Sequence, residues 1–239
     1  FLASVRDVAE AETALAAGAD IVDLKDPAKG ALGALASDAI ASCVAALAGR
    51  AEWSATVGDL EMEPATVLSA VRATAATGVG YVKLGLFPGG DARGCLRLLA
   101  EQARGVRLIL VIFADASPCF DAIREAALIG ASGVMLDTVC KDGRSLLDHL
   151  ALDGLADFVA EARAEGLLVG LAGSLRAVDV PHLLPLEPDL LGFRGALCIG
   201  GARGGSLDQR ACDVIRALIP AEPRGVPRSV LPELSPSLC

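Results

Sequence analysis

The segment ETALAAGADIVDLKD, residues 12–26, contains the pattern that decides the fold. An Ala-rich amphipathic stretch ends at Gly18, and a short apolar run rich in branched residues follows directly. A glycine just past the last helical turn is typical of a helix end, and a short branched run is typical of a buried strand. The same transition recurs as ATGVGYVKLG at 76–85, LIGASGVMLD at 128–137 and AEGLLVGLAG at 164–173. The sequence therefore predicts repeated strand–helix units and a parallel sheet.

Eight such units follow one another along the chain. The apolar runs predict strands at residues 1–5, 20–25, 52–58, 80–85, 107–113, 133–137, 167–173 and 189–195. The amphipathic segments predict helices at 7–18, 36–49, 64–78, 91–104, 118–130, 153–165, 175–184 and 208–219. Open doubly wound sheets have roughly five or six strands, whereas a TIM barrel has eight and takes about 250 residues. The 239-residue chain is therefore predicted to be α/β, a single (β/α)8 TIM barrel.

The end of the chain has a different composition. Residues 220–239, PAEPRGVPRSVLPELSPSLC, contain prolines at 220, 223, 227, 232 and 236. Proline interrupts helices and central strands, so no regular element is expected there. We predict a barrel domain over residues 1–219 and a Pro-rich C-terminal tail over 220–239.

Charge and hydropathy exclude several classes of partner. A formal net charge of −9 argues against nucleic acid and anionic membranes, because both select a basic face. An anionic ligand would need a local basic pocket. No apolar run is long enough to span a membrane, and the N-terminus lacks the basic region of a signal peptide. A cytoplasmic protein with a small-molecule partner is predicted, and a homo-oligomer is expected because barrels of this kind often associate.

Cysteine and histidine provide no metal signature. The seven cysteines include no CxxC pair, and the histidines, His149 and His182, fall outside the predicted strand ends. Neither a zinc site nor a disulfide framework is indicated, which fits a reducing compartment. We predict no metal and no cofactor, and we expect both histidines to be structural.

The use of lysine is the most informative feature. Of the 21 basic residues, 17 are Arg and four are Lys: Lys25, Lys29, Lys83 and Lys141. Three of these, Lys25, Lys83 and Lys141, lie at or just past the C-terminal ends of predicted strands, where barrel active sites are found. Only lysine can lose its proton and attack a carbonyl, because arginine stays charged. These positions are therefore candidates for amine chemistry.

Alternation along the strands predicts which side chains converge. Asp23 and Lys25 share one face of a strand, and Lys25, Lys83 and Asp137 belong to the second, fourth and sixth predicted strands. Because inward side chains of alternate strands stack in layers, we expect these three in one layer at the mouth, with Asp23 one layer deeper. Two ammonium groups about 8 Å apart repel by roughly 2 kcal/mol, so one lysine is expected to stay charged beside a carboxylate while the other becomes partly neutral.

A structural interpretation of these charges stands beside the functional one. One lysine after a strand is as often an exposed strand-end side chain, and Lys29, in the loop PAKG, is expected to be a solvated charge. Three lysines and two aspartates in equivalent places favour a site.

The loops after the seventh and eighth predicted strands are rich in glycine. Barrels often bind phosphate there, because glycine lets backbone N–H groups approach an anion closely. The candidates for phosphate binding are Gly173, Ser174, Arg194, Gly195, Gly200 and Gly201, and Arg203 could add charge.

Three further polar residues fall at strand ends. Thr56, Asp59 and Asp115 could orient substrate hydroxyls or relay protons. The alternative, that each hydrogen-bonds to a loop backbone, is at least as common for these residue types.

Several segments together resemble one family. GADIVDLKDPAKGALGA, SATVGD, YVKLGL, VMLDTVCKDG, LAGS and GFRGALC are similar to the (5-formylfuran-3-yl)methyl phosphate synthase family of methanofuran biosynthesis. The similarity runs from the first strand to the last helix and leaves out the Pro-rich tail. It implies a lyase that condenses two molecules of glyceraldehyde 3-phosphate and releases phosphate and water.

The resemblance also implies roles for individual residues. Lys25 matches the family's Schiff-base lysine, and Lys83 matches its proton acceptor, while Asp23, Asp137 and Lys141 match further charged residues of the site. An iminium at Lys25 would acidify the neighbouring carbon, Lys83 would move the proton, and the enamine would attack a second aldehyde before cyclisation and eliminations. Asp137 and Lys141 would assist proton transfer or hold the leaving phosphate.

Two other functions remain open from the residues alone. A class I aldolase acting on another sugar phosphate would keep the fold and the imine chemistry. A non-catalytic barrel that binds a phosphorylated metabolite would keep only the fold.

Overall fold

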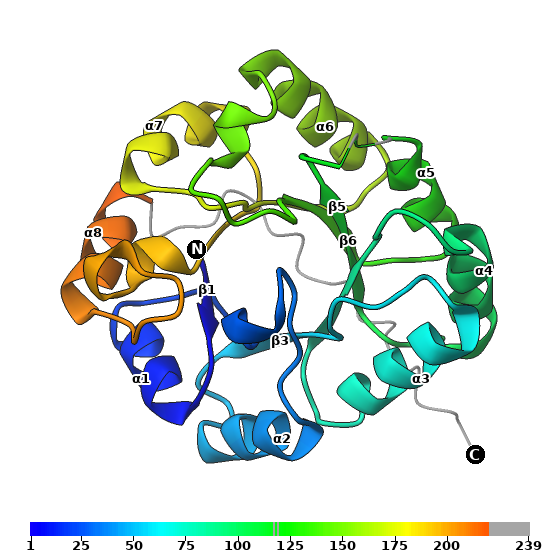
Figure 1. Cartoon of the computed structure of the whole chain (residues 1–239), viewed down its shortest axis with the longest axis horizontal. Helices are drawn as coiled ribbons and strands as arrows, with labels where there is room; N and C mark the ends of the chain where they lie inside the picture. The colour runs from blue at the N-terminus through cyan, green and yellow to red at the C-terminus, as the bar shows by residue number, and fades with distance from the viewer. Residues whose placement is uncertain (117, 119, 220–239) are drawn as a thin grey trace, which may run out of the picture.

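The computed structural model describes residues 1–116, 118 and 120–219, and the predicted tail at 220–239 lies outside these described residues. Eight parallel strands close into a barrel in the order β1 to β8, with β8 paired to β1. The helices form an outer ring around the strands (Figure 1). The predicted (β/α)8 barrel is confirmed. The strands are β1 Leu2–Val5, β2 Ile21–Leu24, β3 Glu52–Thr56, β4 Tyr81–Gly85, β5 Leu108–Phe113, β6 Gly133–Asp137, β7 Leu168–Leu171 and β8 Leu190–Phe193.

Eight α-helices alternate with these strands in the described residues. They are α1 Val8–Ala16, α2 Ser37–Ala46, α3 Pro64–Ala75, α4 Ala92–Gln102, α5 Asp121–Leu128, α6 Leu152–Ala164, α7 Val180–Leu183 and α8 Gln209–Leu218. Short 3-10 helices, η1 Pro27–Lys29, η2 Leu146–Asp148, η3 Ala177–Asp179, η4 Leu184–Leu186, η5 Gly195–Leu197 and η6 Ile199–Gly201, lie in the connections.

The predicted helix at 175–184 was wrong in extent. Residues 177–186 form three short helices, η3, α7 and η4, instead of one. Pro181 and Pro185 lie in the first turns of α7 and η4, where the missing N–H does no harm, but neither can continue a helix that began earlier.

The predicted strands at 167–173 and 189–195 also extended too far, since β7 and β8 stop at Leu171 and Phe193. Gly173 and Ser174 have positive φ values of 107° and 51°, which a strand cannot accommodate.

The helix-to-strand glycines have the predicted left-handed conformation. Gly18, Gly78, Gly130 and Gly166 have φ values of 78°, 89°, 73° and 73°. In the turn at Gly130, the Ala131 N–H donates to the Ala126 carbonyl at 2.9 Å, which closes the last turn of α5 before β6 begins. The recurring glycine therefore fixes where each following strand starts.

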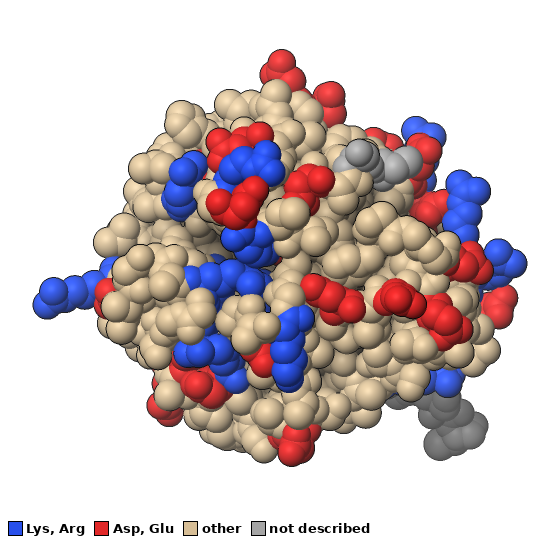
Figure 2. Space-filling view, in the orientation of Figure 1, with Lys and Arg blue, Asp and Glu red and all other residues tan. Residues whose placement is uncertain are grey.

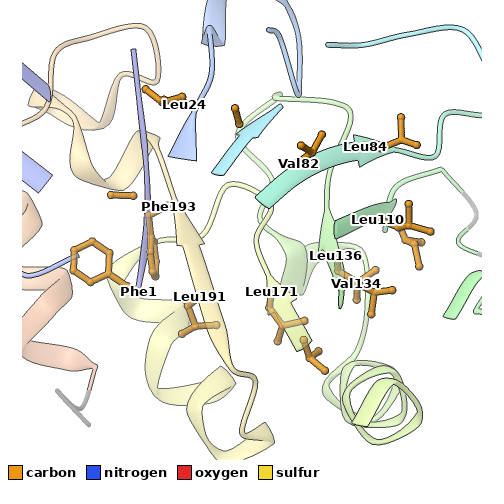
Figure 3. Packing of buried hydrophobic residues seen from close by; sticks show 14 of the residues in the cluster. Phe1, Leu24, Val82, Leu84, Leu110, Val134, Leu136, Leu171, Leu191 and Phe193 are labelled. Carbon is orange, nitrogen blue, oxygen red and sulfur yellow. The ribbon is translucent and has the colours of Figure 1, made fainter. Parts of the chain in front are cut away.

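Two hydrophobic layers hold the barrel. The larger lies between the outward face of the strands and the helices, and Figure 3 shows Val82, Leu110, Leu136 and Leu171 within it. The smaller lies inside the barrel and includes Leu2, Val111, Phe113, Met135 and Ala172. Because these side chains fill part of the barrel interior, the polar residues on the inward face are left toward the carboxyl ends of the strands. No helix in the described ranges is both long enough and apolar enough to cross a membrane.

The conformational role of the turn glycines can be measured with a matched pair. A Cβ added at Gly130 or at Gly154, in α6, meets nothing within 4 Å, but only Gly130 has a left-handed φ. Gly130→Ala is expected to lower the free energy of unfolding by about 1 kcal/mol, and Gly154→Ala to raise it by about 0.5 kcal/mol. Chemical denaturation measures both, and equal effects of the two substitutions would contradict the assigned turn.

Candidate active site

A cavity of about 440 Å³ opens at the carboxyl ends of the strands. Its lining contains six cationic side chains, Lys25, Lys83, Lys141, Arg176, Arg194 and Arg203, and one carboxylate, Asp137. Figure 2 shows Lys and Arg atoms gathered around and inside the hollow at this face. In a chain of net charge −9, this concentration of positive charge makes the cavity suited to an anionic small molecule.

A buried charged pair joins β2 and β4, and one member of it, Lys83, lines the cavity. Lys83 Nζ lies 3.1 Å from Asp23 Oδ2, and both side chains are buried. Ser4 and Ser54 donate to the same carboxylate at 3.0 and 2.6 Å. Burial raises the pKa of Asp23, but the charges of Lys83 and Lys25 and the Ser54 hydrogen bond outweigh it and lower the pKa. Asp23 is therefore ionised, and it forms the buried ion pair with Lys83.

Lys25 has a different environment. Its residue is only 6% exposed, and its Nζ makes no hydrogen bond or ion pair with any described residue. Burial lowers its pKa, the Asp137 charge raises it and the Lys83 charge lowers it, to a value of about 8. At neutral pH a useful fraction of this amine is neutral and nucleophilic.

The third lysine belongs to the loop after β6. Lys141 Nζ lies 2.7 Å from Asp137 Oδ1 and 3.1 Å from Thr138 Oγ1. Burial raises the pKa of Asp137, but the ammonium groups of Lys141 and Lys25 reverse this and lower it to about 2. Asp137 therefore stays anionic between two lysines.

The structure corrects the predicted layers. Lys83 was expected beside Lys25 with Asp23 one layer deeper, but Lys83 contacts Asp23 directly. In the strand register, Asp23 of β2 is opposite Ser54 of β3. Lys83 of β4 is opposite Thr56, two residues further along β3. Because barrel strands tilt by about 36° from the axis, residues at one register are not at one height, and Lys83 falls to the level of Asp23.

The glycine-rich loops lie partly where the sequence suggested. Gly173, Ser174, Gly195 and Gly201 line the cavity, whereas Gly200 is not among its lining residues. The backbone N–H groups of Ser174 and Gly195 donate to no group in the described part of the chain. These two cavity-lining residues therefore have backbone donors that no described residue uses.

Arg194 does not fit the predicted role of phosphate ligand. Its guanidinium donates to Glu10 at 2.5 and 3.2 Å, to the Ser4 carbonyl at 3.1 Å, and to the carbonyls of Arg203 and Gly205 at 2.9 and 2.7 Å. An arginine has five N–H groups, and these contacts use all of them. Arg194 instead ties β8 to β1, to α1 and to the loop that follows β8.

Arg203 also holds loops together. It donates to the carbonyls of Pro27, Gly30 and Ala31 at 2.7, 2.6 and 3.3 Å. It thereby links the loop after β8 to the loop that follows Lys25.

Sequence reasoning missed Glu10 and Arg176. Glu10 is buried in the first turn of α1 and pairs with both Arg6 and Arg194. Its placement four residues after Arg6 was a signal for one of these pairs. Arg176 follows the glycine-rich loop after β7 and lines the cavity, so its position near Ser174 was a signal as well.

The other polar strand-end residues bind loop backbone. Thr56 donates to the Gly33 carbonyl at 3.1 Å, Asp59 accepts from the N–H groups of Ala31 and Leu32, and Asp115 accepts from those of Val139 and Cys140. The loop-capping alternative therefore holds for all three. His149 and His182 do not line the cavity.

The arrangement suits one class of reaction. A buried neutral amine can add to an aldehyde or ketone, and a neighbouring ammonium held by a carboxylate can move protons during imine formation. Free N–H groups and surplus positive charge in the same cavity can hold a phosphate.

The chain is similar to one family of known proteins over most of its length. The 4-HFC-P synthase family model matches residues 1–216. The chain is 43% identical to a protein of Methylorubrum extorquens over 219 residues, covering 91% of each. It is 34% identical to the (5-formylfuran-3-yl)methyl phosphate synthase of Methanocaldococcus jannaschii over 231 residues, covering 91% of this chain and 98% of the relative.

Solved structures with a similar backbone share the fold. Phosphoribosyl anthranilate isomerase from Thermus thermophilus superimposes with a TM-score of 0.62 at 16% identity, covering 91% of this chain and 96% of that one. A 3-hexulose-6-phosphate synthase superimposes with a TM-score of 0.61 at 17% identity, covering 92% and 99%. Both support the barrel architecture and nothing finer.

The pKa of Lys25 predicts a pH profile for its reactivity. The rate at which an amine-selective acylating reagent labels Lys25 should rise with pH up to about 8 and level off above it, because only the neutral amine reacts. In Asp137→Asn the anion that raises this pKa is gone, so the inflection should move to lower pH. Mass spectrometry of the labelled peptides measures both curves, with the exposed Lys29 as internal reference. An inflection that stays in place or moves to higher pH would contradict the assigned electrostatics.

Proposed function

Since this chain belongs to the 4-HFC-P synthase family, we propose that it is a lyase that condenses two molecules of glyceraldehyde 3-phosphate through a Schiff base on Lys25. The product is (5-formylfuran-3-yl)methyl phosphate, and phosphate and water are released. The chain is an enzyme of the family that serves methanofuran biosynthesis. The observation that carries the proposal is the buried, unpaired amine of Lys25 inside a basic cavity.

Imine formation comes first. The neutral amine of Lys25 adds to the aldehyde carbon of one triose phosphate. The π bond of the carbonyl breaks toward oxygen, and a proton moves from the nitrogen to that oxygen to give a carbinolamine. The Lys83 ammonium donates a proton to the hydroxyl, which leaves as water as the nitrogen lone pair forms the iminium. Lys83 is then neutral, and it sits beside the carboxylate of Asp23, which favours its reprotonation.

Proton removal from the adjacent carbon follows. The iminium withdraws electrons from that carbon, and neutral Lys83 takes its proton to leave an enamine. This sequence makes Lys83 the proton acceptor although it begins as an ammonium. Asp23 keeps it in place through both steps, with Ser4 and Ser54 holding the carboxylate.

The enamine supplies the electrons for the later steps. It can form the carbon–carbon bond to the second triose. An enamine with a phosphate on the next carbon can also expel it, since the electron pair shifts to the adjacent bond, the C–O bond breaks and the iminium returns. Lys141, held at 2.7 Å by Asp137, is a proton donor for such a leaving group. Cyclisation and loss of water complete the furan.

We assign the phosphate that stays on the product to the loops after β7 and β8. The N–H groups of Ser174 and Gly195, which donate to no described residue, would bind it, and Gly173 lines the cavity beside them. Arg194 and Arg203 shape this site by holding its loops, and their positive charge favours an anion without direct contact.

Replacement of the Schiff-base lysine tests the proposal. Lys25→Arg keeps the charge but removes the nucleophile, so turnover of glyceraldehyde 3-phosphate to a furan-absorbing product should fall by about 1,000-fold or more. Lys29→Arg, four residues later on an exposed side chain, is the matched control and should keep its activity. Borohydride reduction in the presence of substrate should attach a triose to the Lys25 peptide of the wild type and of Lys29→Arg, and no triose to the corresponding peptide of Lys25→Arg.

The alternatives give different results in the same assays. An adduct without furan product would indicate an aldolase for another sugar phosphate. Absence of any adduct on Lys25 would indicate a binding protein, and wild-type velocity in Lys25→Arg would refute covalent catalysis at that residue.

The role of Lys83 is separable from that of Lys25. Lys83→Gln keeps a hydrogen-bond donor for Asp23 but cannot accept a proton. Because Lys83 also donates the proton for imine formation, borohydride trapping at Lys25 should become slower but should still yield the adduct, while exchange of substrate hydrogen with deuterated water falls by about 100-fold or more, as NMR would measure. Undiminished exchange would remove Lys83 from the proton transfer.

A further inference from the structure

The three cavity arginines differ in the donors that they leave free. Arg194 uses all five N–H groups on described residues, and Arg203 directs Nη1 and Nη2 to backbone carbonyls. Arg176 engages Nε and Nη2 with Asp179, at 3.2 Å each, while its Nη1 donates to no described residue. Arg203 keeps only Nε and one N–H of Nη1 uncommitted, so among the three cavity arginines Arg176 is the one with a whole terminal nitrogen, Nη1, that donates to no described residue.

Arg176 is held in place before any ligand arrives. Its backbone N–H donates to the buried carboxylate of Asp179 at 2.8 Å, and its Nη2 reaches Ser145 Oγ at 3.4 Å. The Leu146 N–H donates to the Gly173 carbonyl at 2.8 Å and joins the same two loops. The loops after β6 and β7 are thus fastened together, and Lys141 and Gly143 of the first loop and Arg176 of the second all line the cavity.

We propose that Arg176 and Lys141 form a second anion subsite, which takes the phosphate that leaves during the reaction. This inference rests on the proposed function, in which two triose phosphates bring two phosphates and the product keeps one. Its ligands are two side chains, whereas the subsite for the retained phosphate uses the backbone donors of Ser174 and Gly195 in the same cavity.

Chemistry decides which phosphate each subsite takes. A backbone N–H stabilises an anion but has no proton to give, so it suits a phosphate that must stay esterified. The Lys141 ammonium can transfer a proton to the bridging oxygen as the C–O bond breaks, and Asp137 at 2.7 Å orients it. The Arg176 side chain is 54% exposed, so a phosphate bound to it can dissociate into solvent.

The test titrates the full-length protein with inorganic phosphate by calorimetry in an anion-poor buffer. We expect two phosphate sites per chain in the wild type and one in Arg176→Gln. Arg176→Lys, which keeps the charge, should recover the second site with weaker affinity. The matched control is Arg144→Gln, because Arg144 is exposed on the neighbouring loop, pairs with Asp142 and does not line the cavity.

A kinetic arm links the subsite to turnover. Product inhibition by inorganic phosphate should weaken by about tenfold or more in Arg176→Gln, while borohydride trapping at Lys25 persists. Arg144→Gln should match the wild type in both assays.

Several outcomes would overturn the inference. They are a single phosphate site in the wild type, two unchanged sites in Arg176→Gln, or an equal loss in Arg144→Gln. Phosphate binding in the resting protein requires no turnover, so failure of the proposed function would appear instead as absent furan product and absent trapping, with the titration unaffected.

Discussion

The buried ion pair between Lys83 and Asp23 is the interaction on which the site depends. The Asp23 carboxylate contacts Lys83 but not Lys25. Hydrogen bonds from Lys83, Ser4 and Ser54 hold this carboxylate in place. Lys25 is buried, and no carboxylate of a described residue contacts it, so burial lowers its pKa to about 8. A carboxylate in direct contact with Lys25 would hold it as an unreactive ammonium. The asymmetry between two chemically identical side chains therefore follows from which one lies at the level of Asp23.

The arginines around the mouth have a mainly architectural role. Arg194 joins Glu10 on α1 to β8, and Arg203 joins the loop after β8 to the loop that follows Lys25. A buried pair such as Glu10 and Arg194 is costly to break, because removal of one partner leaves an unpaired charge. These contacts keep the cavity walls fixed around Lys25, so that the catalytic amine and the free backbone donors keep their relative positions.

The barrel could be predicted because its signals are local. Gly18, Gly78, Gly130 and Gly166 end helices through their own backbone freedom, and branched runs after them make strands, so neither depends on distant residues. Where the local signal was ambiguous, the prediction failed. Residues 175–184 have a helical composition, but Pro181 and the following Pro185 divide the segment into short turns.

The sequence by itself determined which residues reach the mouth of the barrel. Lys25, Lys83 and Asp137 lie near strand ends, and alternation points their side chains inward whatever the rest of the chain does. The tertiary structure alone decided which of them touch. Strand tilt places Lys83 on Asp23, and the folding of distant loops onto one another leaves Arg194 without a free donor and Arg176 with one. The hydrogen bond from Arg194 to the Ser4 carbonyl, for example, joins residues 190 positions apart. The strand register, strand tilt and loop packing that set such contacts exist only in the closed barrel.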